Sequence, residues 1–278
     1  MSPRAGRRLR LVAIGVIALA LAASVQAQFR RGGGRAFFNA RYATPQDFDG
    51  RWHFCRIVFR QDFRGDGGGW SVDYPRADLN LSIRLSELTK TDVSKAPTGE
   101  PNHLLIRLTD PELFDCPFIM MTEPGALGLS DEEAQKLHDY LVKGGFLWAD
   151  DFWGTNAWEW WESQIRLALP RNEFDIVDLP PDHPLFRMQF DVKKTPQIPS
   201  INAWGGPGGN TSERGADSAT VHTRAIADAH GRIMVLMTHN TDFGDSFERE
   251  GDNPSYFLEM SVPGYAIGIN ALLYSLTH

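Results

Sequence analysis

The chain has 278 residues, a formal net charge of −7 and 42% hydrophobic residues. This length accommodates one large α/β domain or two small ones. The acidic balance argues against nucleic acid and against an anionic membrane surface as partners, because both select clustered lysine and arginine.

The N-terminus has the pattern of a secretory signal peptide. Four arginines without an acidic residue precede an apolar or small stretch over residues 11–23, and Val25 and Ala27 supply small residues for cleavage. A helix of that length spans about 20 Å against roughly 30 Å of hydrocarbon, which favours cleavage after Ala27 over an uncleaved anchor. The pair Arg7-Arg8 leaves general secretion and twin-arginine export both open.

The signal peptide determines part of the expected domain organisation. We expect a signal peptide over residues 1–27, a flexible leader over 28–49 and one domain over 50–278, with no stable membrane span after cleavage. The expected location is periplasmic or secreted.

Cys55 and Cys116 are the two cysteines of the chain. An oxidising compartment permits a disulfide between them, and two buried thiols are the alternative.

Strand-like and helix-like segments alternate along the chain. Short apolar or β-branched runs predict strands over 55–59, 103–108, 118–121, 146–149 and 233–237. Helical spacing of apolar residues predicts helices over 78–89, from Ser130, from Asn156 and at the C-terminus. This alternation predicts a doubly wound, mostly parallel α/β sheet with helices on both faces.

Two helix starts carry a capping pattern. Ser130 with Glu133, and Asn156 with Glu159, have the spacing in which side chains satisfy free backbone N–H groups at a helix start. The glycine-rich stretch 202–218 lacks the Gly-Lys-Ser/Thr ending of a nucleotide loop. We interpret it as a long mobile loop, either a flap over a site or plain surface.

Several sequence segments, taken together, resemble an uncharacterised bacterial domain family found in exported and envelope proteins. They are Gly69-Trp70, Asp73-Tyr74-Pro75 with Asp78 and Asn80, the stretch 141–151, Asp182-His183-Pro184 and the closing stretch 270–278. The resemblance covers residues 50–278. That family is distantly similar to class I glutamine amidotransferase-like and trehalose-utilisation-like domains, so the resemblance implies a flavodoxin-like doubly wound fold. Because both residues belong to the matching segments, we count Trp70 and Asp73 among the candidate binding residues.

An amidotransferase nucleophile is missing from the sequence. That chemistry needs a cysteine on a sharp Gly-x-Cys-x-Gly turn. Cys55 stands between Phe54 and Arg56 in an expected strand, Cys116 precedes Pro117, and no Gly-x-Ser-x-Gly occurs. The sequence therefore argues against glutaminase and serine-hydrolase chemistry.

Polar residues follow the expected strands, where open α/β sheets bind ligands. Asp150 and Asp151 follow 146–149, Glu123 follows 118–121, and Asp62 follows 55–59. A larger group follows 233–237, namely His239, Asn240, Asp242 and Asp245. We name Asp150, Asp151 and His239 as candidate catalytic residues. The candidate binding residues are Glu123, Trp153, Asn240, Asp242, Trp70 and Asp73.

These carboxylates and the imidazole could hold a divalent cation and activate water, or act as acid and base on a sugar. The competing interpretation is that strand-end aspartates only cap helices and hold turns. Five tryptophans between positions 148 and 161 fill the core, or leave one ring exposed for a sugar or a protein partner.

Two functions follow from these patterns. The first is a non-enzymatic binding or assembly module of the cell envelope, with an envelope protein or a carbohydrate as partner. The alternative is a metal- or carboxylate-dependent hydrolase acting on a carbohydrate or a related envelope substrate. No cofactor is expected, with a divalent metal as the open alternative. No His-x-x-x-His or Cys-x-x-Cys spacing indicates structural zinc.

Overall fold

The structure, a computed structural model, describes residues 41–206 and 210–278. The expected signal peptide and residues 28–40 of the expected leader lie outside the described residues. Arg41–His278 form one compact unit. Residues 41–49 of the expected leader belong to this unit, since Tyr42 pairs in parallel with Leu105 and the Ala43 N–H donates to the Leu105 carbonyl at 3.0 Å.

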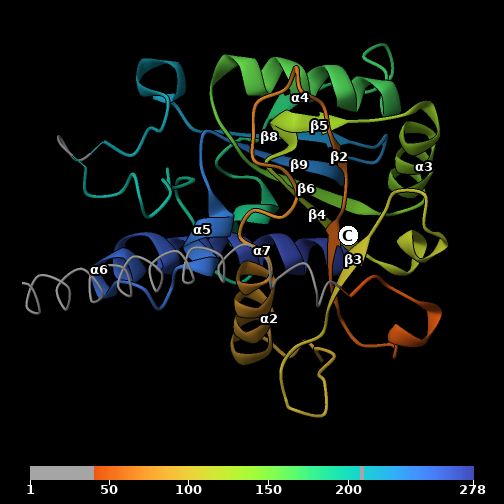
Figure 1. The fold of residues 1–278 in the computed structure, drawn as a ribbon, viewed down its shortest axis with the longest axis horizontal. Coiled ribbons are helices and arrows are strands. Elements are labelled where there is room, and N and C mark those ends of the chain that lie inside the picture. The colour runs from red at the N-terminus through yellow and green to blue at the C-terminus, as the bar shows by residue number, and fades with distance from the viewer. Residues whose placement is uncertain (1–40, 207–209) are drawn as a thin grey trace, which may run out of the picture. The chain divides into compact units, whose positions relative to one another are not determined.

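A seven-stranded sheet runs through the unit in the order β3-β1-β4-β6-β9-β8-β7 (Figure 1). Its strands are β1 (Phe54–Ile57), β3 (His103–Ile106), β4 (Phe118–Thr122), β6 (Phe146–Phe152), β7 (Val177–Asp178), β8 (His222–Ala227) and β9 (Ile233–His239). Neighbouring strands from β3 to β9 are parallel, whereas β8 is antiparallel to both of its neighbours, β9 and β7. A separate ribbon pairs β2 (Arg60–Gln61) with β5 (Leu127–Gly128).

Helices cover both faces of the sheet, which confirms the predicted fold class (Figure 1). The helices are α2 (Arg76–Leu88), α3 (Asp131–Val142), α4 (Gly154–Ala168), α5 (Phe243–Glu248), α6 (Pro254–Tyr256) and α7 (Val262–Thr277). One apolar cluster contains Leu137 of α3 and Trp161 of α4. A second cluster contains Leu81 of α2, Phe247 of α5 and Ile269 of α7. Each face of the sheet therefore has its own core.

The two capping predictions have different outcomes. Ser130 caps α3, and its hydroxyl accepts from the Glu133 N–H at 3.3 Å in a complete capping box. Helix α4 begins at Gly154 rather than at Asn156, so that prediction was wrong. Its first N–H groups donate to side chains distant in sequence: Gly154 to Asn240 Oδ1 at 2.8 Å and Thr155 to Asp217 Oδ2 at 2.9 Å.

Cys55 and Cys116 form a disulfide, with their Cα atoms 6.3 Å apart. Both residues are buried in the cluster beneath α3 and α4. The bond joins β1 to the residue two positions before β4, and these strands are neighbours in the sheet. Of the two alternatives that the sequence leaves open, the structure therefore has the disulfide.

Two features of the fold bear on where a ligand could bind. The sheet order reverses direction between β1 and β4, and open α/β sheets bind ligands beyond the strand ends near such a reversal. Within the described ranges, no helix combines the length and the apolar character that a membrane span requires.

Candidate functional site

An acidic pocket of about 380 Å³ lies at the carboxyl ends of β4, β6 and β9. Residues from the segment before α2, from α5 and from the segments around 200 and 213 complete it. It is lined by seven carboxylates and one arginine: Asp73, Glu123, Asp151, Glu213, Asp242, Asp245, Glu248 and Arg249. We call it the acidic pocket below.

Unusual backbone conformations gather at this edge. Among the described residues, four non-glycine residues have positive φ: Asp73 (62°), Glu123 (50°), Asp151 (59°) and Asn240 (64°). The first three line the acidic pocket. Such conformations cost about 1 to 3 kcal/mol each and concentrate at functional sites.

Asp73 reaches the pocket on a segment that a buried arginine holds. Arg56 of β1 is fully buried and forms an ion pair with Asp78 of α2. The same guanidinium donates to the Trp70 and Val72 carbonyls at 3.1 Å each. The segment that carries Asp73 is therefore tied directly to the central sheet.

Asp73 is 8% exposed, and its Oδ2 atom has no hydrogen-bond partner among the described residues. This oxygen lies so close to Gly244 that any side chain at position 244 would collide with it. A buried carboxylate oxygen without a donor is destabilising unless another positive group compensates it. Asp73 therefore favours either a proton or a positive partner at this position.

Asp151 enters the pocket because the strand is irregular there. The pairing of β6 with β9 shifts register between Asp150 and Phe152, which leaves Asp151 on a bulge. Bulges redirect side chains and are frequent beside active sites. The Trp153 indole donates to Asp151 Oδ1 at 2.9 Å and fixes the carboxylate.

Asp242 lies between β9 and α5 and is 3% exposed. Its Oδ1 accepts from the Asp245 N–H at 2.7 Å, which caps the short helix α5. The capping role that the sequence leaves as an alternative therefore holds for one oxygen of Asp242.

Asp73, Asp151 and Asp242 each offer an oxygen to one cluster, in which these atoms lie within 4.8 Å of one another. Burial, then repulsion from neighbouring carboxylates, raises the pKa of all three well above the ordinary value. Repulsion among three such carboxylates disfavours their full ionisation, and a cation bound between them would favour their charged forms.

A second group joins Asp73 with Asp245 and Glu248. These two partners already have a cation, because Arg249 Nε lies 3.2 Å from Asp245 and 2.9 Å from Glu248. Asp245 Oδ2 also accepts from the Ile201 N–H. The first group is therefore the better metal site.

Glu123 lies beside Asp151. Among the charged neighbours that raise the pKa of Asp151, Glu123 has the largest effect. The Gly69 N–H donates to its carboxylate at 3.3 Å. Burial raises the pKa of Glu123 to about 7. A carboxyl with that pKa can accept or donate a proton at neutral pH, as a general base or acid requires.

Asp150, a candidate catalytic residue, does not line the pocket. Its Oδ2 accepts from the Phe243 and Gly244 N–H groups at 2.9 and 3.1 Å, and its Oδ1 accepts from the Thr238 hydroxyl. Burial raises the pKa of Asp150 to about 7 although these donors favour its charged form. Both oxygens thus attach β6 to β9 and α5.

His239 and Asn240 also lie outside the acidic pocket. The His239 ring packs between Phe152, Trp158 and His222, and burial lowers its pKa to about 4. Asn240 accepts from the Gly154 N–H and donates to the Thr220 carbonyl at 2.7 Å. Asp62 pairs with Arg64 instead. The structure thus places these residues in packing and turns.

The tryptophans are mostly core. Trp148 and Trp161 are fully buried, Trp153 is 6% exposed, and Trp158 and Trp160 are half-buried. Trp70 is also half-buried, and its ring packs against Tyr74 at 5.9 Å. None of these six rings is an exposed platform for a sugar.

Of the nine candidate residues, the structure brings four together in the pocket: Asp73, Glu123, Asp151 and Asp242. Sequence reasoning missed Glu213, Glu248 and Arg249. Asp242, Asp245 and Glu248 recur every three residues, which places three acids on one side of the segment after β9 and could have indicated the α5 contribution. Glu213 carries no such signal, although it lies in the glycine-rich stretch interpreted as a loop or flap.

The raised carboxyl pKa values predict how the cation-free domain responds to pH. Glu123 and Asp150, with pKa values of about 7, lose their protons between about pH 6.5 and 8. Over this window the free energy of unfolding is expected to fall as pH rises, by at most about 1.4 kcal/mol per pH unit for each proton that only the folded state retains. Below pH 6.5, buried histidines such as His239, with a lowered pKa, act in the opposite direction. Urea denaturation with a chelator measures this fall, and Glu123→Gln should make it smaller. A rise in stability over this window would contradict the assignment.

Comparison with known protein families identifies one family. No curated protein matches the chain. A family described as a domain of unknown function, DUF4159, matches residues 54–276 and so covers most of the chain. This confirms the resemblance to an uncharacterised domain family. The chain belongs to the DUF4159 family of domains of unknown function.

Proposed function

We propose that this domain binds one divalent cation through Asp73, Asp151 and Asp242, and that its function depends on this cation. The observation that carries the proposal is the buried, unpartnered Oδ2 of Asp73 beside two further buried carboxylates. No cationic side chain of the described residues pairs with this group of three carboxylates, and a bound cation would compensate their negative charge.

The chemistry of the donors indicates a hard cation. Carboxylate oxygens are the ligands that Ca²⁺, Mg²⁺ and Mn²⁺ prefer. Oxygens on opposite sides of a calcium ion are about 4.6 to 5.2 Å apart, so a cluster within 4.8 Å matches calcium, whereas magnesium requires the oxygens to lie within about 4.2 Å of one another. Ser71 and Asn202, which also line the pocket, offer further oxygen ligands.

Replacing Asp73 by Asn is expected to abolish stabilisation by divalent cations. A cation at 100 times its dissociation constant should stabilise the wild type by about 2.7 kcal/mol, which raises the melting temperature by about 5 °C or more. Thermal unfolding with Ca²⁺, Mg²⁺ or Mn²⁺ measures this shift. The Asp73 Oδ2 atom accepts no hydrogen bond from the described residues, so the substitution removes a ligand with little structural damage.

Asp115→Asn is the matched control, because it removes the same charge from an exposed residue outside the pocket. It should keep the full cation-dependent shift. Equal shifts in the two variants would exclude the assigned site.

Metal-assisted hydrolysis is the reaction that the residues of the pocket support best. A bound divalent cation polarises a substrate oxygen and lowers the pKa of water. Glu123, with a pKa of about 7, can accept a proton from an attacking water in the same pocket. Seven carboxylates against one arginine leave excess negative charge after one cation binds, so the substrate should be neutral or cationic.

Glu123→Gln tests this use. Cation-dependent hydrolysis of a neutral p-nitrophenyl ester or glycoside should fall by about 10² to 10⁴ in this variant, with cation affinity retained. p-Nitrophenyl phosphate, which is anionic, should be a poor substrate. Cation binding without any hydrolysis of these probes would instead favour the non-enzymatic binding or assembly module. The capping roles of Asp150 and Asp242 support that second candidate, since they assign part of the strand-end acids to structure.

The proposed setting is the cell envelope. The disulfide supports export, because such bonds persist in oxidising compartments. Recovery of a processed chain that begins at Gln28 from the periplasm or the medium would agree with export, and cytoplasmic retention of the full chain would contradict it. A distant relation to amidotransferase-like domains is supported only by the doubly wound sheet, and both cysteines are in the disulfide.

A further inference from the structure

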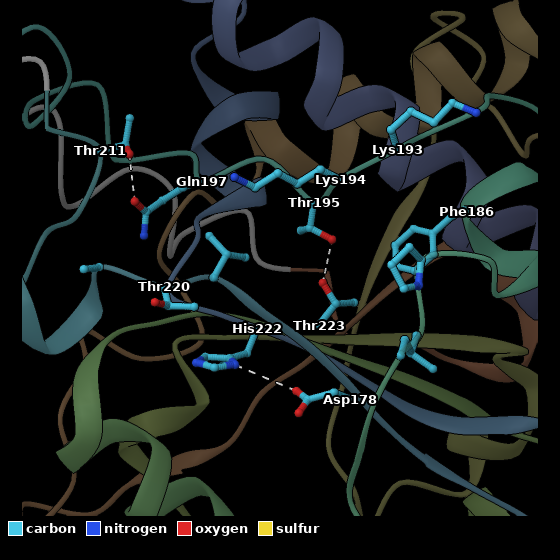
Figure 2. Close-up of a pocket in the computed structure, with 14 residues that line it drawn as sticks. Asp178, Phe186, Lys193, Lys194, Thr195, Gln197, Thr211, Thr220, His222 and Thr223 are labelled. Carbon is cyan, nitrogen blue, oxygen red and sulfur yellow. Dashed lines mark hydrogen bonds and ion pairs between the residues drawn. The ribbon is translucent and has the colours of Figure 1, made fainter.

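A second pocket, of about 690 Å³, lies beside the antiparallel edge of the sheet (Figure 2). Residues of β7 and β8 line it, together with the segments 193–197 and 219–221. Its volume is in the range of pockets that enclose a small ligand. It shares no lining residue with the acidic pocket, although the chain from Gln197 to Ser200 passes from one to the other. We call it the basic pocket.

The charge of the basic pocket is opposite to that of the protein. The chain has a net charge of −7, yet this pocket is lined by Lys193 and Lys194 against a single carboxylate, Asp178. His222 also lines it, and burial lowers the pKa of this imidazole, so it adds a neutral ring. That carboxylate already lies 3.1 Å from Arg224 Nε and 3.8 Å from His222. A ligand here should therefore carry negative charge.

The two lysines are not equivalent. Lys193 pairs with Asp191, and in Figure 2 it extends away from the other labelled side chains. Lys194 extends toward Gln197 in the same view, and its ammonium forms no ion pair or hydrogen bond within the described residues. Lys194 is therefore the lysine that can pair with a ligand.

Hydroxyl groups surround the remaining space. Thr195, Thr211, Thr220 and Thr223 line the pocket. The Thr195 and Thr223 hydroxyls lie 2.6 Å apart, and a hydroxyl pair of this kind uses one hydrogen between its members and leaves the other to donate. The pocket thus presents at least one hydroxyl donor near Lys194.

The walls are rigid and partly apolar. Gln197 donates to the Ser218 and Asn240 carbonyls at 2.8 and 3.1 Å and accepts from Thr211 at 2.7 Å, so its amide is fixed. Phe186 and Leu179 add apolar surface to the pocket. Hydroxyl donors, one free ammonium and an apolar wall together match a sugar ring that carries one anionic group.

We propose that the basic pocket binds an acidic monosaccharide unit, with Lys194 pairing with its carboxylate or phosphate and the Thr195–Thr223 pair hydrogen-bonding its hydroxyls. This site is independent of the cation site. Neither Lys193 nor Lys194 lines the acidic pocket, so substitutions of these lysines leave the cation site intact and the two proposals fail separately.

Calorimetric titration of the domain with glucuronate, glucose 6-phosphate, glucose and inorganic phosphate tests the proposal. At least one acidic sugar should bind about tenfold more tightly than glucose and than phosphate. Binding of both acidic sugars means that any anionic group suffices, and binding of one alone identifies the group. Lys194→Gln should weaken the binding by about tenfold, and Lys193→Gln by less than about twofold.

Three results would overturn it. They are the absence of saturable binding of either acidic sugar at millimolar concentrations, phosphate binding as tight as that of the sugars, and equal losses in the two lysine variants. The last would indicate general electrostatic attraction instead of pairing with Lys194. Both lysines are exposed, so neither substitution is expected to impair folding.

Discussion

Arg56→Met is expected to lower the free energy of unfolding by about 3 to 5 kcal/mol, because it leaves Asp78 as a buried and unpaired charge. Both side chains are fully buried. The guanidinium also donates to the Thr122 hydroxyl at 2.6 Å and to two carbonyls of the segment before α2. Urea denaturation at pH 7.5 with a chelator present measures the loss.

The same substitution should weaken cation binding, because Arg56 holds the segment that carries Asp73. Arg56 is thus a positioning residue and not a ligand. Adding Asp78→Asn to Arg56→Met should recover part of the lost stability by removing the unpaired charge, without restoring cation affinity. Arg171→Met is the control, since Arg171 is 74% exposed and its ion pair with Glu162 should contribute at most about 1 kcal/mol. Equal losses for the two arginines would refute the assigned role.

Replacing both Cys55 and Cys116 by Ala is expected to lower the free energy of unfolding by about 4 kcal/mol. The bond closes a loop with a sequence separation of 61, and a loop of that length restricts the unfolded chain by roughly this amount. The urea midpoint of the double variant measures the effect.

Dithiothreitol provides the control for this prediction. It should lower the urea midpoint of the wild type toward that of the variant, because unfolding exposes the buried bond, and it should leave the double variant unchanged. A wild type with an unaltered midpoint under reducing conditions would show that the disulfide does not contribute to stability.

Much of the fold could be predicted from local patterns. The apolar runs at 118–121, 146–149 and 233–237 became β4, β6 and β9, because buried parallel strands are apolar on both faces. The start of α3 was predictable because Ser130 and Glu133 act within one turn. The start of α4 was not, because Asp217 and Asn240, which satisfy its N–H groups, are distant in sequence.

The candidate site shows the same division. Glu123, Asp151 and Asp242 followed from the rule that ligands bind beyond strand ends, whereas Asp73 entered only through the family resemblance. The rule could not separate Asp150 from Asp151. Adjacent strand residues point to opposite sides, and only the bulge in β6 determines that Asp151 faces the pocket. The Cys55–Cys116 pairing likewise depends on strand order, which neither cysteine's local sequence reveals.

The most direct test of the account is the cation stoichiometry of the metal-free domain, measured by titration calorimetry with Ca²⁺ and Mn²⁺ at pH 7.5. We expect one saturable site per chain in the wild type, no such site in Asp73→Asn, and affinity that rises with pH as the cation displaces carboxyl protons. A wild type that binds neither cation, or an Asp73→Asn variant that binds as tightly as the wild type, would contradict it.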